Sequence, residues 1–201
     1  MTKLFALVVL HKGDAAVHIL KTGWDLSSIS FFQRGTAQDF IKFTSKILVE
    51  RTGVGARQSV KEGEYMCHVF VRGDRLSVVC VSDHEYPPRE AHTMMQRVSE
   101  DFADQIKPTE WSKGQEVVGF NGQLEVHLNK FQDPTQSDTM SRLQTDLDDT
   151  KIVLHSTIEA VLQRGEKLDD LVEISETLSK QSKLFYRKAR KTNSCCGTSW
   201  G

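Results

Sequence analysis

The side chains that could do covalent or metal chemistry in this sequence are those of four cysteines and seven histidines. The cysteines form no Cys-x-x-Cys pair, and the histidines show no metal-ligand spacing. Cys67 and His68 are adjacent in a predicted strand, where neighbouring side chains point to opposite faces, so they cannot act as a nucleophile and its base. The sequence therefore predicts no catalytic centre, no metal and no cofactor, and we do not expect an enzyme. Covalent lipid is the only attached group left to consider.

One charged residue stands inside an otherwise mostly apolar seam. Between residues 138 and 192, positions spaced alternately by three and four residues form a heptad seam like that of a coiled coil. Arg164 occupies a central position of this seam, and a guanidinium is not buried without hydrogen-bond acceptors. Ten of the sixteen seam positions are apolar, namely Met140, Leu143, Leu147, Leu154, Val161, Leu168, Leu171, Leu178, Phe185 and Ala189.

Arg164 has two interpretations. In a bundle of identical helices its copies would repel one another, so the residue favours a bundle with different helices that present acceptors such as glutamine at the same level. A buried polar layer of that kind fixes the register of the helices. The alternative is an arginine that extends into solvent from an imperfect seam, and the residues by themselves leave both interpretations open.

The C-terminal residues combine two features that attach proteins to membranes. Six basic residues and no acidic residue follow Glu176 up to residue 192, and Cys195 and Cys196 come next. Basic residues near anionic lipid contribute about 1 kcal/mol each. One lipid chain binds only reversibly, so stable anchoring needs a second signal. We therefore expect residues 193–201 to be a short tail with a lipid-anchor site, supported by the basic stretch.

Residues 1–132 have the pattern of a compact α+β domain. Strands are expected at 4–10, 16–20, 58–61, 65–71 and 76–81, separated by short polar or glycine-containing turns. A helix is expected to follow Ser27 and Ser28 and to run to about Glu50, and a second one begins at Pro87 and Pro88. The resulting order, ββαβββα, predicts five antiparallel strands with helices packed on them.

The first predicted helix carries two apolar stripes. One stripe can pack on the sheet, and the second contains Phe40, Phe43 and Ile47. Because exposed phenylalanines are costly, this second face needs a partner. It is either part of a thick core or a docking face for another segment of this chain or for a lipid.

Composition excludes two further classes of protein. The 201 residues carry 26 basic and 27 acidic side chains, a net charge of −1, and so lack the basic excess of a nucleic-acid-binding domain. The sequence contains no run of 18 apolar residues, so it predicts no membrane-spanning helix. Four cysteines without disulfide spacing suit a reducing cytosol.

The residues around Arg164 resemble a known family. The sequence from Val161 to Leu171 reads VLQRGEKLDDL and is similar to the central signature of the R-SNAREs, in which the arginine meets three glutamines from Q-SNARE helices. Residues 1–132 resemble the longin (profilin-like) domain in size and element order, and residues 138–192 resemble the R-SNARE coiled-coil motif. The resemblance covers nearly the whole chain and is strongest to longin R-SNAREs that lack a transmembrane helix.

The resemblance implies a function in membrane fusion within intracellular trafficking. The seam would form one long helix of a four-helix bundle with three Q-SNARE helices, and the longin domain would target the protein and dock the folded-back segment. The family's location would be the cytoplasm and the cytoplasmic face of Golgi, endosomal and vesicle membranes. The alternative is a longin-type adaptor that binds SNAREs or coats without driving fusion.

The family also implies lipid on the cysteine pair, with palmitate on Cys195 and a prenyl group on Cys196. Prenylation needs a cysteine fourth from the end. This sequence has Thr198 at that position, and this departure argues against prenylation of Cys196 in the chain as written.

Overall fold

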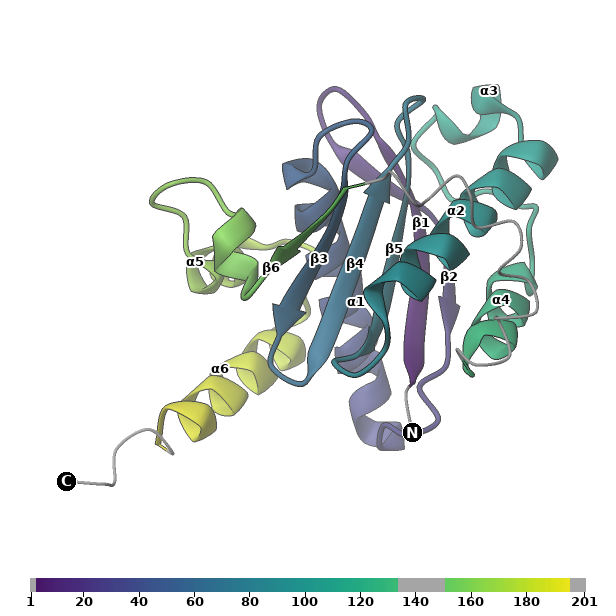
Figure 1. Ribbon diagram of the computed structural model, residues 1–201. Helices are drawn as coiled ribbons and strands as arrows, with labels where there is room; N and C mark the ends of the chain where they lie inside the picture. The colour runs from purple at the N-terminus through teal and green to yellow at the C-terminus, as the bar shows by residue number, and fades with distance from the viewer. Residues whose placement is uncertain (1–2, 134–150, 196–201) are drawn as a thin grey trace.

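A six-stranded sheet forms the centre of this computed structural model, which describes residues 3–133 and 151–195 (Figure 1). The strand order is β2-β1-β5-β4-β3-β6. Every neighbouring pair is antiparallel except β3 and β6, which run parallel. The bounds are β1 (Leu4–Lys12), β2 (Val17–Trp24), β3 (Arg57–Glu62), β4 (Tyr65–Val71), β5 (Leu76–Asp83) and β6 (Ile152–His155).

Strand β1 is apolar at consecutive positions because both of its faces are covered. Leu4, Leu7 and Val9 belong to the core cluster on one face of the sheet. Phe5 and Val8 belong to the cluster on the other face. A strand that is buried on both sides loses the polar alternation of a half-exposed strand.

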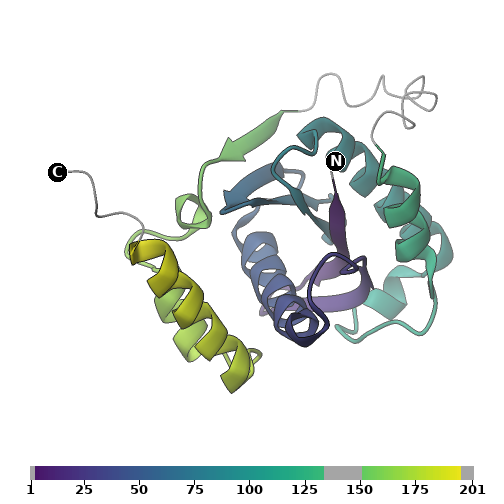
Figure 2. The ribbon, with the colours of Figure 1, turned by 90° about the horizontal axis from the view of Figure 1, so that it is seen from below.

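Helices cover the two faces of the sheet (Figure 2). Three helices contribute side chains to one cluster, and the long helix α1 contributes to the other. Helix α4 lies directly on β2, since a Cβ at Gly23 would be only 2.4 Å from the Cβ of Leu124. The bounds are α1 (Phe31–Arg51), α2 (Pro88–Gln105), α3 (Pro108–Trp111) and α4 (Gln123–Phe131).

The α+β order predicted for the N-terminal domain is confirmed, with small differences at its elements. Helix α1 begins at Phe31, later than predicted, because the backbone N–H and the hydroxyl of Ser27 both donate to the Asp25 carboxylate in a turn before it. Strand β2 continues to Trp24, and α3 and α4 extend the domain to Phe131. We call residues 3–133 the N-terminal domain.

The heptad segment (residues 138–192) differs from the single long helix that its repeat predicts. Its described part consists of β6, the 3₁₀ helix η2 (Ile158–Val161), α5 (Leu168–Ile174) and α6 (Lys180–Cys195). Gly165, with φ 91°, lies between η2 and α5 in a conformation that suits glycine. A continuous helix would expose its whole apolar seam in the absence of other helices, whereas the broken segment buries apolar side chains on the N-terminal domain. No helix among the described residues is long and apolar enough to cross a membrane.

Candidate functional site

The heptad segment first meets the N-terminal domain at the edge of the sheet. Strand β6 pairs with β3 in parallel, in a register that runs from Arg57 beside Ile152 to Val60 beside His155 (Figure 1). Without β6, strand β3 would present unpaired backbone groups along this edge. The segment thus binds its own domain by adding a strand, a mode in which main-chain hydrogen bonds supply affinity and side chains supply specificity.

Apolar side chains from the next elements complete one core with α1 and the sheet. Four apolar residues of the described heptad segment are at most 6% exposed, and they join a cluster that contains Phe43 and Ile47 of α1. Phe40 packs against the same cluster at its margin. The second apolar stripe of α1 is therefore covered in this structure, by a core that the heptad segment shares. The four buried residues are Ile158, Leu168, Val172 and Leu178.

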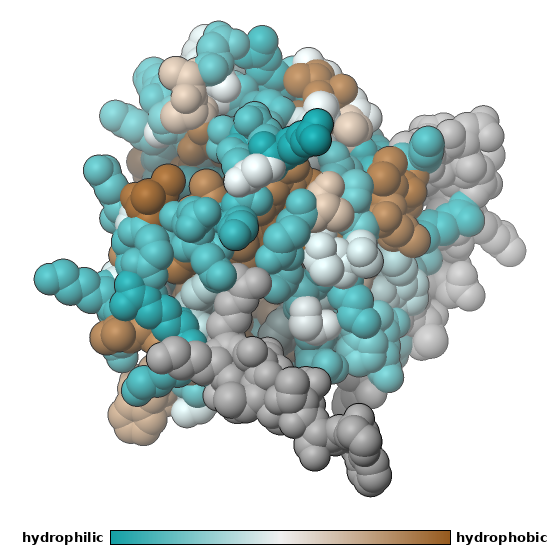
Figure 3. Space-filling view, turned by 90° about the vertical axis from the view of Figure 1, so that its left-hand side faces the viewer, coloured by the Kyte–Doolittle hydropathy of each residue, from teal (hydrophilic) through white to brown (hydrophobic). Residues whose placement is uncertain are grey.

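Helix α6 lies against α1 through an aromatic and a polar contact. The rings of Phe40 and Tyr186 stack with centroids 5.5 Å apart. The hydroxyl of Ser182, a residue 1% exposed, donates to the Asp39 carboxylate over 2.8 Å. Figure 3 views this side of the molecule, where apolar patches remain among mostly polar side chains.

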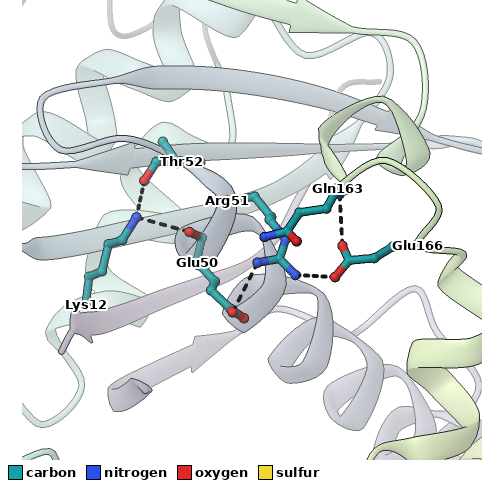
Figure 4. A network of polar contacts seen from close by, with 6 residues as sticks. All are labelled: Lys12, Glu50, Arg51, Thr52, Gln163 and Glu166. Atoms are coloured by element: carbon teal, nitrogen blue, oxygen red, sulfur yellow. Dashed lines mark hydrogen bonds and ion pairs between the residues drawn. The ribbon is translucent and has the colours of Figure 1, made fainter. Parts of the chain in front are cut away.

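An ion pair ties the loop that carries Arg164 to the end of α1 (Figure 4). Nη2 of Arg51 donates to Oε1 of Glu166 over 2.7 Å, and Oε2 of Glu166 accepts the backbone N–H of Gln163 over 2.9 Å. Arg51 also pairs with Glu50, whose backbone carbonyl accepts from Lys12. Glu166 therefore stabilises the loop through its contact with Gln163 and attaches the loop to the N-terminal domain through Arg51.

The predicted seam residues fall into three groups in this structure. Leu168 and Leu178 are buried, and Val161 and Leu171 are half-buried. Leu154 and Phe185 are 64% and 41% exposed, and Arg164 is exposed as well. Met140, Leu143, Leu147 and Cys196 lie outside the described residues, as do the side chains of Ala189 and Cys195.

The remaining cysteine and histidine candidates are buried in the sheet. Burial raises the pKa of Cys67 to about 12 and also raises that of Cys80, so both thiols stay protonated and unreactive. Cys67 lies in the α1 cluster, whereas His68 points to the opposite face, as strand alternation predicts. Among the described residues, no group of histidine, cysteine and carboxylate side chains could hold a metal ion.

His68 belongs to a buried polar network that sequence reasoning missed. Its Nδ1 lies 2.8 Å from the Ser59 hydroxyl and its Nε2 lies 3.1 Å from that of Ser82. Nε2 of His92 lies 3.1 Å from the same Ser59 hydroxyl. Burial lowers the pKa of His68 to about 4 and that of His92 to about 3, so both rings are neutral at physiological pH. Three strands and α2 supply the network, and no local signal joins them.

Sequence reasoning also missed the contact residues of the heptad segment that lie beside the seam. These are Ile158, Val172, Tyr186 and Glu166. The first three are spaced by 14 residues. That regular spacing was a signal available in the sequence.

Comparisons with known proteins match two parts of this chain to two families. Residues 26–121 match the Longin family, described as a regulated-SNARE-like domain, and residues 139–196 match the Synaptobrevin family. The synaptobrevin homologue ykt6 of Schizosaccharomyces pombe is 46% identical over 194 residues, which cover 96% of this chain and 98% of the relative. The homologues YKT6 of Eremothecium gossypii and Saccharomyces cerevisiae are 43% and 40% identical, with the same shares covered.

Proposed function

This chain belongs to the longin-domain R-SNAREs, a family of membrane-trafficking proteins and not of enzymes, and we propose that it drives fusion between intracellular membranes. In this proposal the heptad segment forms a four-helix bundle with three Q-SNARE helices. Arg164 lies at the centre of that bundle and donates hydrogen bonds to the side-chain carbonyl oxygens of glutamines from the three partners. The exposed position of Arg164 in the free chain leaves its guanidinium solvated until those acceptors arrive.

The observation that carries the proposal is that the N-terminal domain of the free chain buries part of the seam. Leu168 and Leu178 are seam residues, and both are buried against the N-terminal domain. Residues 152–155 form a strand, which cannot at the same time be part of a helix. The docked and assembled forms are thus mutually exclusive, so the N-terminal domain inhibits assembly until the segment leaves it.

The energies of the two forms favour assembly once partners are present. Full burial of an apolar side chain stabilises by about 1.5–3 kcal/mol, and four apolar residues of the described segment are buried in the docked form. A bundle would bury ten apolar layers. The docked form therefore holds the chain without partners, while the bundle supplies the larger driving force with them.

Attachment to membranes is part of the same proposal. The basic residues of α6 lead directly to the predicted tail, so lipid on Cys195 or Cys196 would place the end of the bundle at the bilayer surface. The docking face of Phe40, Phe43 and Ile47 would hold the segment while the protein is away from the membrane. The proposed location is the cytoplasm together with the cytoplasmic face of Golgi, endosomal or vesicle membranes.

The test is reconstituted lipid mixing with Phe43→Glu. The chain is coupled to liposomes through maleimide lipid at the C-terminal cysteines, since Cys67 and Cys80 are buried and unreactive. We expect lipid mixing only with liposomes that carry the three Q-SNARE helices, and faster mixing for Phe43→Glu. The matched control is Phe31→Glu, in the same helix but 76% exposed, which should behave like the wild type. Q-SNARE binding without lipid mixing would instead indicate an adaptor.

A further inference from the structure

The docked heptad segment uses a different set of side chains from its seam. In the usual labels, the seam consists of positions a and d, with Leu154, Val161 and Leu168 at a and Thr157 and Leu171 at d. The position directly after d is e, which lies beside the seam in a bundle. An α-helix advances about 100° per residue, so a face centred on a and e is rotated by about 50° from one centred on a and d.

The same exchange of d for e occurs at three levels of the segment. Thr157 is exposed, but Ile158 beside it is 1% exposed. Leu171 is half-buried, but Val172 is 0% exposed. Ile158 and Val172 lie in different elements, η2 and α5, so one local irregularity does not explain both.

The third level lies in α6. Phe185, at d, is 41% exposed, whereas Tyr186, at e, stacks on Phe40 and donates its hydroxyl to Asp169 over 2.9 Å. The intervening e positions are Gly165 and Ser179, two small residues that are both exposed. The e positions from Ile158 to Tyr186 thus alternate between apolar and small residues.

Resting on the proposed function, we infer that Ile158, Val172 and Tyr186 form a second stripe that selects the N-terminal domain as partner, separately from the seam that selects Q-SNARE helices. Glu166 extends this division, because it follows position e and points away from a bundle axis, yet it pairs with Arg51 in the docked form. The a residue Leu168 serves both partners, because it is 6% exposed here and is also a bundle layer. Leu178, at d, is also only 5% exposed and so serves both partners. Ile158, Val172 and Tyr186 at e therefore set how tightly the segment is held, whereas Thr157 and Phe185 at d, which are exposed here, act in assembly alone.

The experiment compares neighbouring residues substituted by the same side chain. Position e of a coiled coil commonly carries lysine, whereas a lysine at a d layer weakens the bundle. Ile158→Lys should therefore release the segment in the free chain and leave the stability of the bundle unchanged. Thr157→Lys should leave the segment docked in the free chain and lower the stability of the bundle. Val172→Lys is the second e variant, in a different element.

Two measurements are made on the full chain. Hydrogen exchange of the free protein reports docking, and we expect exchange over residues 152–174 to quicken by at least about tenfold in Ile158→Lys and Val172→Lys but not in Thr157→Lys. Exchange in β1 and β5 is the internal control, because both strands lie in the N-terminal domain. Thermal melting of the complex with three Q-SNARE helices reports assembly, and we expect a lower melting temperature only for Thr157→Lys.

Unchanged exchange in both e variants, with an intact sheet, would overturn the inference. So would a bundle that Ile158→Lys weakens as much as Thr157→Lys does. Failure of the wild type to form any complex with Q-SNARE helices would refute the proposed function instead, and the exchange measurement would still decide whether the stripe holds the segment.

Discussion

Reversing the charge of either Arg51 or Glu166 should release the docked segment from the N-terminal domain. Reversing both charges together should restore docking. Nη2 of Arg51 lies 2.7 Å from Oε1 of Glu166, and the two side chains are 16% and 26% exposed. Arg51→Glu would place two carboxylates in this contact, next to Glu50. Glu166→Arg would place two guanidinium groups there. The double variant restores opposite charges at the same two positions.

The size of the effect follows from the exposure of the pair. Fully exposed ion pairs contribute about 0.2–1 kcal/mol, and this pair is largely screened from water, so we expect a coupling of about 1 kcal/mol. That energy corresponds to about a fivefold change in the ratio of open to docked chains. Glu166→Arg also removes the acceptor of the Gln163 N–H, so the double variant should recover only part of wild-type docking.

The assay is hydrogen exchange over residues 152–174 in low and high salt. Both single variants should exchange faster than the wild type, and the double variant should exchange at a rate between the wild type and the single variants. High salt should reduce these differences. The control is Arg187→Gln, which removes a pair with Glu173 inside the heptad segment and leaves the contact with the N-terminal domain unchanged. If the effects of the two single substitutions on the exchange rate simply add in the double variant, the role of this pair is refuted.

Two other predictions concern the buried histidines and the tail. His68 and His92 have pKa values of about 4 and about 3, below the 6.5 of the unfolded chain, because burial disfavours their charged forms. Between about pH 6.5 and 4 the unfolded chain therefore binds more protons, so acidification destabilises the fold, by about 2 kcal/mol per histidine at about pH 5. Urea unfolding at about pH 7 and 5 measures this loss, which should shrink by about half in His92→Gln; an unchanged pH dependence would contradict it. Cys195→Ser with Cys196→Ser should move the protein from membranes to cytosol in cell fractionation, and an unaltered membrane fraction would show that basic residues or another protein hold it there.

The sequence by itself determined the local features of this protein. Continuous apolar runs and turn residues predicted the strands and helices of the N-terminal domain, because strand and helix periods are set by neighbouring residues. Strand alternation separated Cys67 from His68. The heptad spacing identified the seam and Arg164 within it, and the motif around Arg164 pointed to the family.

Only the tertiary structure decided what the heptad segment does in the free chain. A repeat states which side chains share a face if the segment is helical, but not which surface buries them. The edge of β3 and the second stripe of α1 form a surface on which the broken segment buries Ile158 and Val172. Because this burial is favourable, the free segment forms a strand and short helices and not one long helix. Arg51 and Glu166 are 115 residues apart in sequence, and the Ser59 network draws on four elements. Such contacts depend on chain segments that meet only after folding, and no local pattern in the sequence records them.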